Sequence, residues 1–465
     1  MRKGDLCNAR QAVLLYALFS YAQVLIVTDQ QIHLPEPIII PRSEHRISRA
    51  NISDNALKVL YRLKNAGYEA YLVGGGVRDL SLGREPKDFD VATDARPEDV
   101  KNLFRNCRLI GRRFRLAHVH FGPEIIEVAT FRALHDGGDE GEERVIEDGR
   151  ILRDNVYGTL AEDAMRRDFT INALYYNIAD FSVVDHAGGM ADLESGEIRL
   201  IGDPQVRFRE DPVRMLRAVR FAAKLGFRIH PDTADPIPEM AELLEHIPAA
   251  RLFDEILKLL MAGAGVETFE LLRHYGLFAP LFPQTEESLR NEQDSTSGMF
   301  IAQALKNTDE RIAEGKPVTP AFLFAALLWP ALQQRLRVMM EEGLSEPQAY
   351  QEASREVLAE QVQTVAIPKR FSMPMREIWT LQQRFERRNG RRALRMVSHP
   401  RFRAAYDFLL LRAQVGDAPA DLAEWWREFY EGSEAQRQHM VDDSSPRRRR
   451  RRRRRRSPKA SESSD

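Results

Sequence analysis

The sequence predicts an α+β protein in which a head with a mixed β-sheet is followed by a long all-helical part. In the first half of the chain, short runs of β-branched and aromatic residues, bounded by glycine and proline, alternate with helical patterns. From Asp211 onward, amphipathic helical patterns recur, as in residues 251–262 and 402–415. Together these two observations indicate the α+β class.

The length allows several domains, because 465 residues with 43% hydrophobic content can bury a substantial core. Two cysteines, Cys7 and Cys107, are too few for a disulfide framework or a thiolate metal site, which suits a reducing cytoplasm. We expect five segments in chain order: a largely disordered leader and linker (1–51), a head domain (52–180), a helical neck (181–283), an all-helical body (284–431) and a disordered arginine-rich tail (432–465).

The charge of the chain is unevenly distributed. Residues 447–456 are ten consecutive arginines, and without them the formal net charge of −1 would become −11. Such a run attracts phosphate strongly and without regard to sequence. We expect it to tether RNA or to contact an acidic protein, and an accidental low-complexity extension is the remaining alternative.

A glycine-rich corner is the first chemical signal. Residues 69–73 form a predicted buried strand and residues 77–82 a predicted helical turn. Between them, Gly74 and Gly75 begin a glycine triplet whose backbone N–H groups can approach an anion closely. This corner predicts a phosphate-binding site.

Two acidic residues follow in the next predicted strand, residues 88–92. Because side chains alternate along a strand, Asp88 and Asp90 project from one face and Phe89 from the other. Carboxylate oxygens suit Mg²⁺, and two such ions can hold the attacking and leaving oxygens of a displacement at phosphorus. Each motif alone is common, but their order and spacing indicate a site for metal and nucleoside triphosphate.

Two further polar groups lie beside predicted strands of the head. Glu127 lies in an apolar run where an unpaired charge is costly, so it is either a third acid of the metal site or the partner of an arginine. Arg166, Arg167 and Asp168 form a dense cluster. The planar fork of arginine suits triphosphate oxygens, and an ion pair among these neighbours is the alternative.

Five stretches follow one another in register from about residue 52 to about residue 283. They are Gly-Gly-x-Val-Arg-Asp at 74–79 with Asp-x-Asp at 88–90, Arg-Arg-Asp-Phe-Thr at 166–170, Asp-His-Ala-Gly-Gly at 185–189, Glu-Asp-Pro-Val-Arg at 210–214, and the helical segment 218–226. In this order they resemble the class II nucleotidyltransferases, which comprise bacterial poly(A) polymerases and tRNA CCA-adding enzymes. The resemblance implies a polymerase-β-like head followed by an all-α neck, body and leg.

The resemblance also implies roles for individual residues, with ATP as the substrate. Asp88 and Asp90 would be catalytic ligands of two Mg²⁺ ions, with Mn²⁺ as an alternative metal. Asp168 would contribute an acid or hold the ribose, which leaves open whether Asp168 or Glu127 is the third acid. The nucleotide would be bound by Gly74, Gly75, Arg78 and Arg167 at the triphosphate, and by Asp211 and Arg214, three apart on one helix face, at the base.

Residues 109–119 distinguish between the two activities of the family. This stretch resembles one typical of bacterial poly(A) polymerases, and its Arg112 and Arg113 would contact nucleotide or RNA. The expected function is therefore template-independent addition of AMP from ATP to RNA 3′ ends, which promotes RNA turnover. A tRNA CCA-adding enzyme is the alternative. A catalytically silent RNA-binding or chaperone protein is disfavoured, because the acidic residues are intact.

Eight arginines lie between residues 384 and 403, with Arg388 and Arg392 among them. They could grip an RNA backbone, although charged helix faces are usually only solvated. The expected partners are 3′ ends of mRNA, small RNA and tRNA precursors, and RNA-decay proteins through the tail. We expect a monomer.

The N-terminus carries an apolar stretch over residues 12–27, preceded by Arg2 and Lys3. It resembles a secretory signal, but it is short for a membrane span and no clear cleavage site follows. An enzyme that uses ATP and RNA works in the cytoplasm, so we discount export. The stretch is a poorly ordered leader, the result of a start codon placed too far upstream, or a peripheral contact with the inner membrane.

Overall fold

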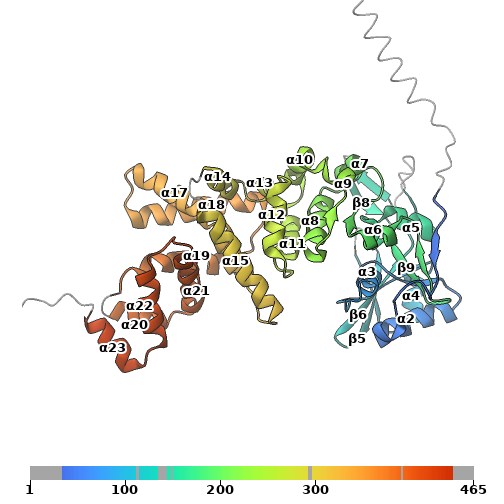
Figure 1. Ribbon diagram of the computed structural model, residues 1–465, viewed down its shortest axis with the longest axis horizontal. Helices are drawn as coiled ribbons and strands as arrows, with labels where there is room; N and C mark the ends of the chain where they lie inside the picture. The colour runs from blue at the N-terminus through green and yellow to red at the C-terminus, as the bar shows by residue number, and fades with distance from the viewer. Residues whose placement is uncertain are drawn as a thin grey trace, which may run out of the picture. The chain divides into compact units, whose positions relative to one another are not determined.

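The computed structural model describes residues 34–111, 115–134, 144–147, 150–154, 156–291, 296–388 and 391–443 (Figure 1). The chain divides into two compact units, Met1–Asp203 and Pro204–Asp465. Arg112, Arg113, the apolar stretch 12–27 and the ten-arginine run lie outside the described residues.

The N-terminal unit is built on an eight-stranded mixed sheet with the order β1-β10-β9-β2-β3-β6-β5-β4. β3 and β6 run parallel, whereas the other neighbours with a described register run antiparallel. The mixed sheet confirms the predicted head. The strands of this sheet are β1 (Ile38–Ile40), β2 (Ala70–Val73), β3 (Asp90–Thr93), β4 (Cys107–Ile110), β5 (Leu116–Phe121), β6 (Glu124–Thr130), β9 (Leu174–Asn177) and β10 (Val183–Asp185).

Helices pack against this sheet because its residues are apolar on both faces. All four residues of β2 are buried. One face carries an apolar cluster that includes Val73, Ala92 and Tyr175, and Leu160 and Ala164 of α5 pack against it. The remaining elements of the unit are α2 (Asp54–Asn65), α3 (Gly75–Ser81), α4 (Pro97–Leu103), α5 (Leu160–Arg166), α6 (Gly189–Ser195), the 3-10 turns η1 (Arg49–Asn51) and η2 (Thr170–Asn172), the paired β7 (Arg144–Glu147) and β8 (Arg150–Asp154), and β11 (Glu197–Ile198).

The predicted linker before residue 52 is partly ordered, which corrects the expectation for its described part. Ile38 pairs with Asp185, so β1 forms an edge of the sheet. Ile47 is fully buried, and the ring Nε2 of His45 lies 2.9 Å from the carbonyl oxygen of Phe181. An edge strand needs only backbone pairing on one side, so the prolines and charges that predict a linker do not prevent it.

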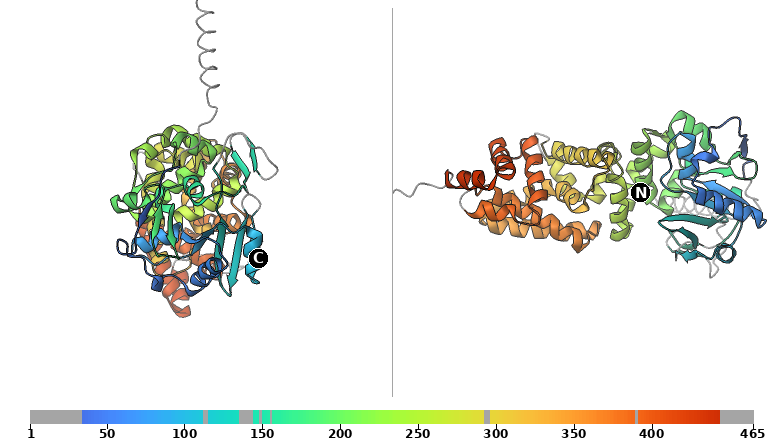
Figure 2. Two further views of the ribbon diagram at one scale, coloured as in Figure 1. Left: turned by 90° about the vertical axis from the view of Figure 1, so that its right-hand side faces the viewer. Right: turned by 90° about the horizontal axis from the view of Figure 1, so that it is seen from below.

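The C-terminal unit is helical, as expected, and Figure 2 shows it from two further directions. No helix among the described residues combines the length and the apolar character that crossing a membrane requires. The elements of the C-terminal unit are α7 (Pro204–Glu210), α8 (Val213–Leu225), β12 (Arg228–Ile229), α9 (Pro231–Ala234), α10 (Ile237–Met240), η3 (Ala241–His246), α11 (Ala249–Leu260), α12 (Gly265–His274), α13 (Phe278–Leu281), α14 (Pro283–Asn291), α15 (Thr296–Ala313), α16 (Pro320–Leu327), α17 (Trp329–Glu341), α18 (Glu346–Thr364), α19 (Lys369–Phe385), α20 (Arg391–Val397), α21 (Phe402–Gln414), α22 (Ala420–Glu431) and α23 (Glu434–Asp443).

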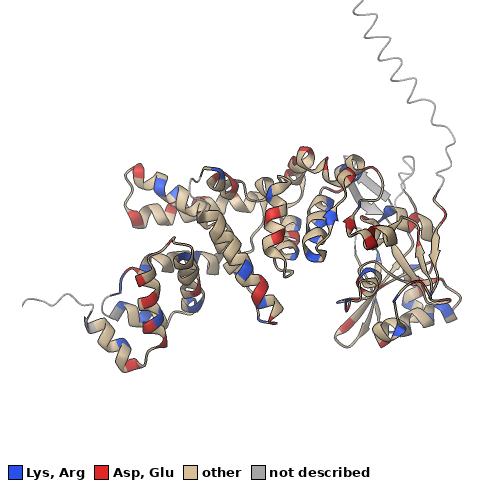
Figure 3. Cartoon of the chain, in the orientation of Figure 1, with Lys and Arg blue, Asp and Glu red and all other residues tan. Residues whose placement is uncertain are grey.

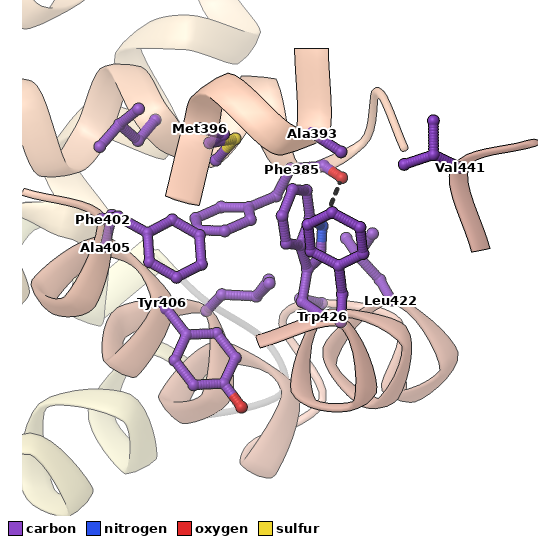
Figure 4. Close-up of a cluster of buried hydrophobic side chains, with 13 residues drawn as sticks. Phe385, Ala393, Met396, Phe402, Ala405, Tyr406, Leu422, Trp426 and Val441 are labelled. Atoms are coloured by element: carbon purple, nitrogen blue, oxygen red, sulfur yellow. Dashed lines mark hydrogen bonds between the residues drawn. The ribbon is translucent and has the colours of Figure 1, made fainter. Parts of the chain in front are cut away.

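An aromatic cluster joins α19 to the last helices of the chain (Figure 4). Trp426 is fully buried, and its indole Nε1 donates a 2.8 Å hydrogen bond to the carbonyl oxygen of Phe385. Val441 of α23 is only 2% exposed and belongs to this cluster. The prediction that disorder begins at residue 432 is therefore wrong for residues 434–443. A short helix with few apolar residues has little periodicity of its own and is ordered by the cluster on which it packs.

Candidate active site

The glycine corner connects β2 to α3. Gly74 has φ of +72°, a conformation that residues with a side chain rarely adopt. A Cβ on Gly74 would lie 3.5 Å from an Nη1 atom of Arg167, and one on Gly75 would lie 3.5 Å from Nη2 of Arg78. Two guanidinium groups therefore lie against this corner. The helix begins at Gly75, two residues earlier than predicted.

Arg78 is held inside the head. Its side chain is 4% exposed and pairs with Asp79 at 2.7 Å. Its Nη1 donates a 2.7 Å hydrogen bond to Oδ1 of Asn172. The amide nitrogen of Asn172 lies 3.2 Å from Oδ1 of Asp168, which also accepts from the backbone N–H of Phe169. Arg78 is thus linked through Asn172 to Asp168.

Arg167 is oriented by two residues that the sequence analysis missed. Its Nε donates to the Tyr175 hydroxyl at 2.8 Å, and its Nη2 lies 3.1 Å from the Asp163 carboxylate. Tyr175 in turn donates to Asp163 at 2.7 Å. Burial opposes ionisation of Arg167, but Tyr175 and Asp163 outweigh it and raise the pKa of the guanidinium. The spacing of Asp163 and Arg167, four apart at a helix end, was the available signal.

A row of side chains crosses the sheet at Asp90. Asp90 pairs with Val73 of β2 and with Glu127 of β6. Glu127 pairs with His118, and Val73 pairs with Tyr175. Because residues directly opposite one another point to the same face of a sheet, these side chains share the face of Asp90. Glu127 is thereby placed next to Asp90, 37 positions away in the sequence.

Asp90 lies among negative charges. Burial and the Glu127 carboxylate raise the pKa of Asp90 from 3.8 to about 6. Arg167 opposes this rise, and Asp88 adds to it. The carboxylates of Asp88 and Asp90 are therefore close enough to interact, whereas Phe89 packs against Gly76 of α3. The strand begins at Asp90 and not at Asp88, so Asp88 lies on the exposed segment that leads into it.

The acids beside the glycine corner offer a partial donor set for a divalent metal. Within the described residues, no three His, Cys, Asp or Glu side chains are arranged as a ready-made metal site. Asp88 and Asp90 nevertheless supply hard oxygen donors, and a cation between them would relieve the repulsion that raises the pKa of Asp90. Glu127 is 40% exposed, and its Oε2 lies 3.3 Å from Nε2 of His118. The partner of Glu127 in this structure is thus a histidine.

The two candidate base-reading residues lie at the start of α8 in the C-terminal unit. Asp211 precedes the helix, and its Oδ2 accepts a 2.7 Å hydrogen bond from Arg251 of α11. Arg214 donates to Oε2 of Glu210 at 2.8 Å and to the carbonyl oxygen of Arg207 at 2.6 Å. Each candidate is therefore fixed by a neighbour, and Arg251 is a residue that sequence reasoning missed.

The two named arginines of the body differ in their surroundings. Arg388 pairs with Asp421 at 3.0 Å. Arg392 is exposed and lines a small hollow between α19 and α20.

Three family models match the chain in the order of its segments. The Poly A polymerase head domain covers residues 70–199. The probable RNA and SrmB-binding site of polymerase A covers residues 226–289. The arginine-rich C-terminus of polymerase A covers residues 342–459.

Curated relatives match over most of the chain. Poly(A) polymerase I of Salmonella typhimurium is 56% identical over 420 residues, which cover 89% of this chain and 90% of the relative. Poly(A) polymerase I of Haemophilus influenzae is 48% identical over 409 residues, or 87% and 90%. The CCA-adding enzyme of Lactobacillus gasseri is 40% identical over 266 residues, but this match covers only 54% of this chain and 64% of the relative.

Solved structures share the fold. The crystal structure of the Bacillus stearothermophilus CCA-adding enzyme in complex with CTP matches with a TM-score of 0.55 and 29% identity, covering 80% of each chain. A tRNA nucleotidyltransferase complexed with a primer tRNA and an incoming ATP analog matches with a TM-score of 0.52 and 25% identity, covering 80% of this chain and 98% of that one.

The mixed-sheet head, the glycine corner and the adjacent carboxylates define a nucleotidyltransferase that acts on a nucleotide with a divalent metal. Within this class, the chain belongs to the poly(A) polymerase I family. It is a template-independent polynucleotide adenylyltransferase that extends RNA, as the sequence predicts. The alternative of CCA addition is set aside, because the CCA-adding relatives match only about half of the chain.

Proposed function

We propose that AMP is transferred from ATP to the RNA 3′ end at the row of acids beside the glycine corner. The observation that carries this proposal is the strand register that places Asp90 opposite Glu127 and opposite Val73, the residue before Gly74, where the Arg167 guanidinium also lies. Burial and the Glu127 carboxylate raise the pKa of Asp90, which agrees with a cluster of acids at this point. Asp88 and Asp90 would hold two Mg²⁺ ions, with Mn²⁺ as an alternative. When bound, the metal lowers the pKa of the attacking hydroxyl and neutralises charge on the leaving group.

The residues of the head position the triphosphate. Arg167 is held by Asp163 and Tyr175 with its guanidinium at the corner, where it would neutralise phosphate oxygens. The backbone N–H of Gly75 would donate to the same oxygens, while the N–H of Gly74 pairs with the carbonyl oxygen of Leu174 and its φ of +72° lets the chain turn close to the phosphate. A bond forms between the 3′ oxygen and the α-phosphorus while the bond to pyrophosphate breaks, and the hydroxyl proton passes to solvent. Arg78 would act through Asn172 and Asp168 rather than by touching the substrate.

Asp88→Ala is expected to reduce AMP incorporation by on the order of 10²–10³-fold or more, because one of two metal-binding carboxylates is lost. RNA affinity should stay unchanged, since Asp88 is an exposed acid of the head and not a cationic group. Extension of an unstructured RNA with ATP measures the first quantity and filter binding the second. Glu85→Gln, which removes an exposed acid on the same loop, is the matched control. Near-normal turnover by Asp88→Ala would refute the assigned role.

The choice of adenine is proposed to depend on Asp211 and Arg214, an acceptor and a donor fixed at the start of a rigid helix. Arg251 and Glu210 would hold these two side chains in place. RNA would be held in addition by Arg112, Arg113, Arg392 and the ten-arginine run, and by Arg388 where RNA replaces Asp421 as its partner; these groups act on phosphate without regard to sequence.

Arg251→Met is expected to lower the preference for ATP over CTP, GTP and UTP by about 10–100-fold, because Asp211 loses a charged hydrogen bond that orients it. Competition among the four nucleotides in single-step extension measures this preference. Lys258→Met removes another paired cation from the same helix and should leave the preference unchanged. An unaltered preference in Arg251→Met would show that Asp211 needs no such support.

A further inference from the structure

A hollow of ≈ 290 Å³ lies at α19, α20 and the segments that follow them, and it is lined by Leu381, Arg384, Arg387, Arg392, Arg395, Met396 and His399. We propose that this arginine hollow binds one nucleotide unit of RNA, with its phosphate on the guanidinium groups and its base or ribose on the apolar floor. The proposal rests on the RNA-tailing function and adds a defined site to it.

The four arginines carry uncompensated charge. Within the described part of the chain, no hydrogen bond or ion pair joins any of these guanidinium groups to another residue. Their neighbours differ, since Arg388 pairs with Asp421 and Arg401 pairs with Glu377 at 3.2 Å. Acidic and basic side chains are otherwise interspersed along the helices of the C-terminal unit (Figure 3). All four side chains are exposed, so water screens their mutual repulsion, and together they give the hollow a positive potential that attracts an anion.

The hollow has a rigid apolar floor. Leu381 is 2% exposed and Met396 is 7% exposed, and both belong to the aromatic cluster that contains Phe385 and Trp426 (Figure 4). An ion alone would not need such a floor. A nucleotide would use it, because its base and ribose carry apolar faces beside the phosphate, and arginine planes also stack on bases.

The size of the hollow limits the ligand. Pockets for small ligands measure about 300–1,000 Å³, so ≈ 290 Å³ suits a single nucleotide unit and excludes a duplex. A peptide of acidic residues offers carboxylates, but it has no aromatic ring beside each charge to lie on the apolar floor. A nucleotide has both groups, so nucleic acid is the better match. The lining residues belong to the C-terminal unit, and none of them is assigned to the chemical step. Loss of the hollow should therefore weaken RNA binding and leave the chemistry intact.

The test uses the full-length protein and the double variant Arg387→Gln/Arg392→Gln, which removes one charge from the segment that follows α19 and one from α20. Binding of a 20-nucleotide oligoadenylate is measured across a range of NaCl concentrations. We expect the Kd to rise about 10-fold or more, and the slope of log Kd against log salt to fall by about 0.7, because one phosphate contact is lost. The KM for this RNA should rise with kcat unchanged, and the KM for a trinucleotide primer should stay the same.

The matched control is Arg401→Gln/Arg403→Gln, which removes two exposed arginines that already pair with Glu377 and Asp407. It should leave the salt slope near that of the wild type, and both double variants should unfold at the wild-type temperature. An unchanged Kd and slope in the hollow variant would overturn the proposal. A fall in kcat on the trinucleotide would also overturn it, because the substitution would then act on chemistry or folding.

Two further arms identify the ligand. If AMP displaces the oligoadenylate only from proteins with an intact hollow, the site also accepts free nucleotides; if AMP does not displace it, the site is specific to the RNA chain. Tight binding of a polyglutamate peptide that is lost in the hollow variant would overturn the assignment to a nucleotide. A wild-type protein that incorporates no AMP would contradict the proposed function, whereas an unchanged KM contradicts the hollow alone.

Discussion

Asp90→Asn is expected to stabilise the metal-free protein above pH 6 while it abolishes AMP incorporation. Burial and the neighbouring carboxylates raise the pKa of Asp90 from 3.8 to about 6, so the folded state disfavours its charged form. At neutral pH this corresponds to a cost of about 3 kcal/mol that an uncharged Asn would remove. The charged Asp90 carboxylate would also attract the metal. The metal-free protein is therefore less stable because it carries a charge that the metal would neutralise.

The sign of this effect can be followed with pH. Below pH 3.8 the carboxyl is protonated in both the folded and the unfolded chain and contributes no cost. As the pH rises toward about 6, the unfolded chain releases its proton first and the wild type loses stability relative to Asp90→Asn. Above about pH 6 the difference should be constant.

Thermal unfolding of both proteins in EDTA between pH 4 and pH 8 measures this difference. Glu194→Gln removes an exposed acid from α6 of the same unit and should change the unfolding temperature little at any pH. Addition of Mg²⁺ should stabilise the wild type more than Asp90→Asn. An Asp90→Asn protein that is less stable than the wild type at pH 7.5 would show that Asp90 forms a favourable contact instead.

Asp163→Ala is expected to lower the free energy of unfolding by about 3 kcal/mol and to raise the KM for ATP. The substitution leaves the Arg167 guanidinium without its carboxylate and the Tyr175 hydroxyl without its acceptor. Breaking a buried ion pair costs about 3–5 kcal/mol, and the lower value applies because the Arg167 side chain is 24% exposed. Arg167 would then no longer be held at the glycine corner.

Tyr175→Phe is the graded control, because it removes the hydroxyl that donates to Asp163 and accepts from Arg167 but keeps the ion pair. It should cost about 2 kcal/mol, or about 1 kcal/mol for each hydrogen bond, and raise the KM for ATP less than Asp163→Ala does. Urea unfolding and steady-state kinetics with ATP as the varied substrate provide both quantities. If Tyr175→Phe and Asp163→Ala changed the free energy of unfolding and the KM for ATP equally, the Tyr175 hydroxyl and not the Asp163 carboxylate would be the group that positions Arg167.

Local patterns account for the features that could be predicted. The glycine corner depends on residues that follow one another directly, and φ of +72° at Gly74 agrees with it. Strand alternation predicts opposite directions for Asp90 and Phe89, and in the structure Phe89 packs against Gly76 while Asp90 lies opposite Glu127. The start of β3 could not be predicted. The alternating pattern of residues 88–92 predicts a strand that begins at Asp88, but the pairing with β2 and β6 begins at Asp90.

Contacts between distant segments account for what was missed. Arg251 reaches Asp211 from a position 40 residues later, and no periodicity links the two. Glu127 comes next to Asp90 because β3 and β6 pair in parallel, an arrangement set by the order of strands in the sheet. The composition of α23 and of β1 predicts disorder. In the structure α23 is ordered by packing on the aromatic cluster, and β1 is ordered by pairing with β10 at the edge of the sheet.

The sequence by itself determined the class of protein, the helical C-terminal part and the residue types of the site, because these depend on neighbours within a few positions. Only the tertiary structure decided which groups share one face: the row of acids at Asp90, the support of Arg167, and the four arginines around the hollow. The physical reason is that a charge takes its pKa and its partners from whatever the fold brings within a few ångströms, whatever the distance along the chain.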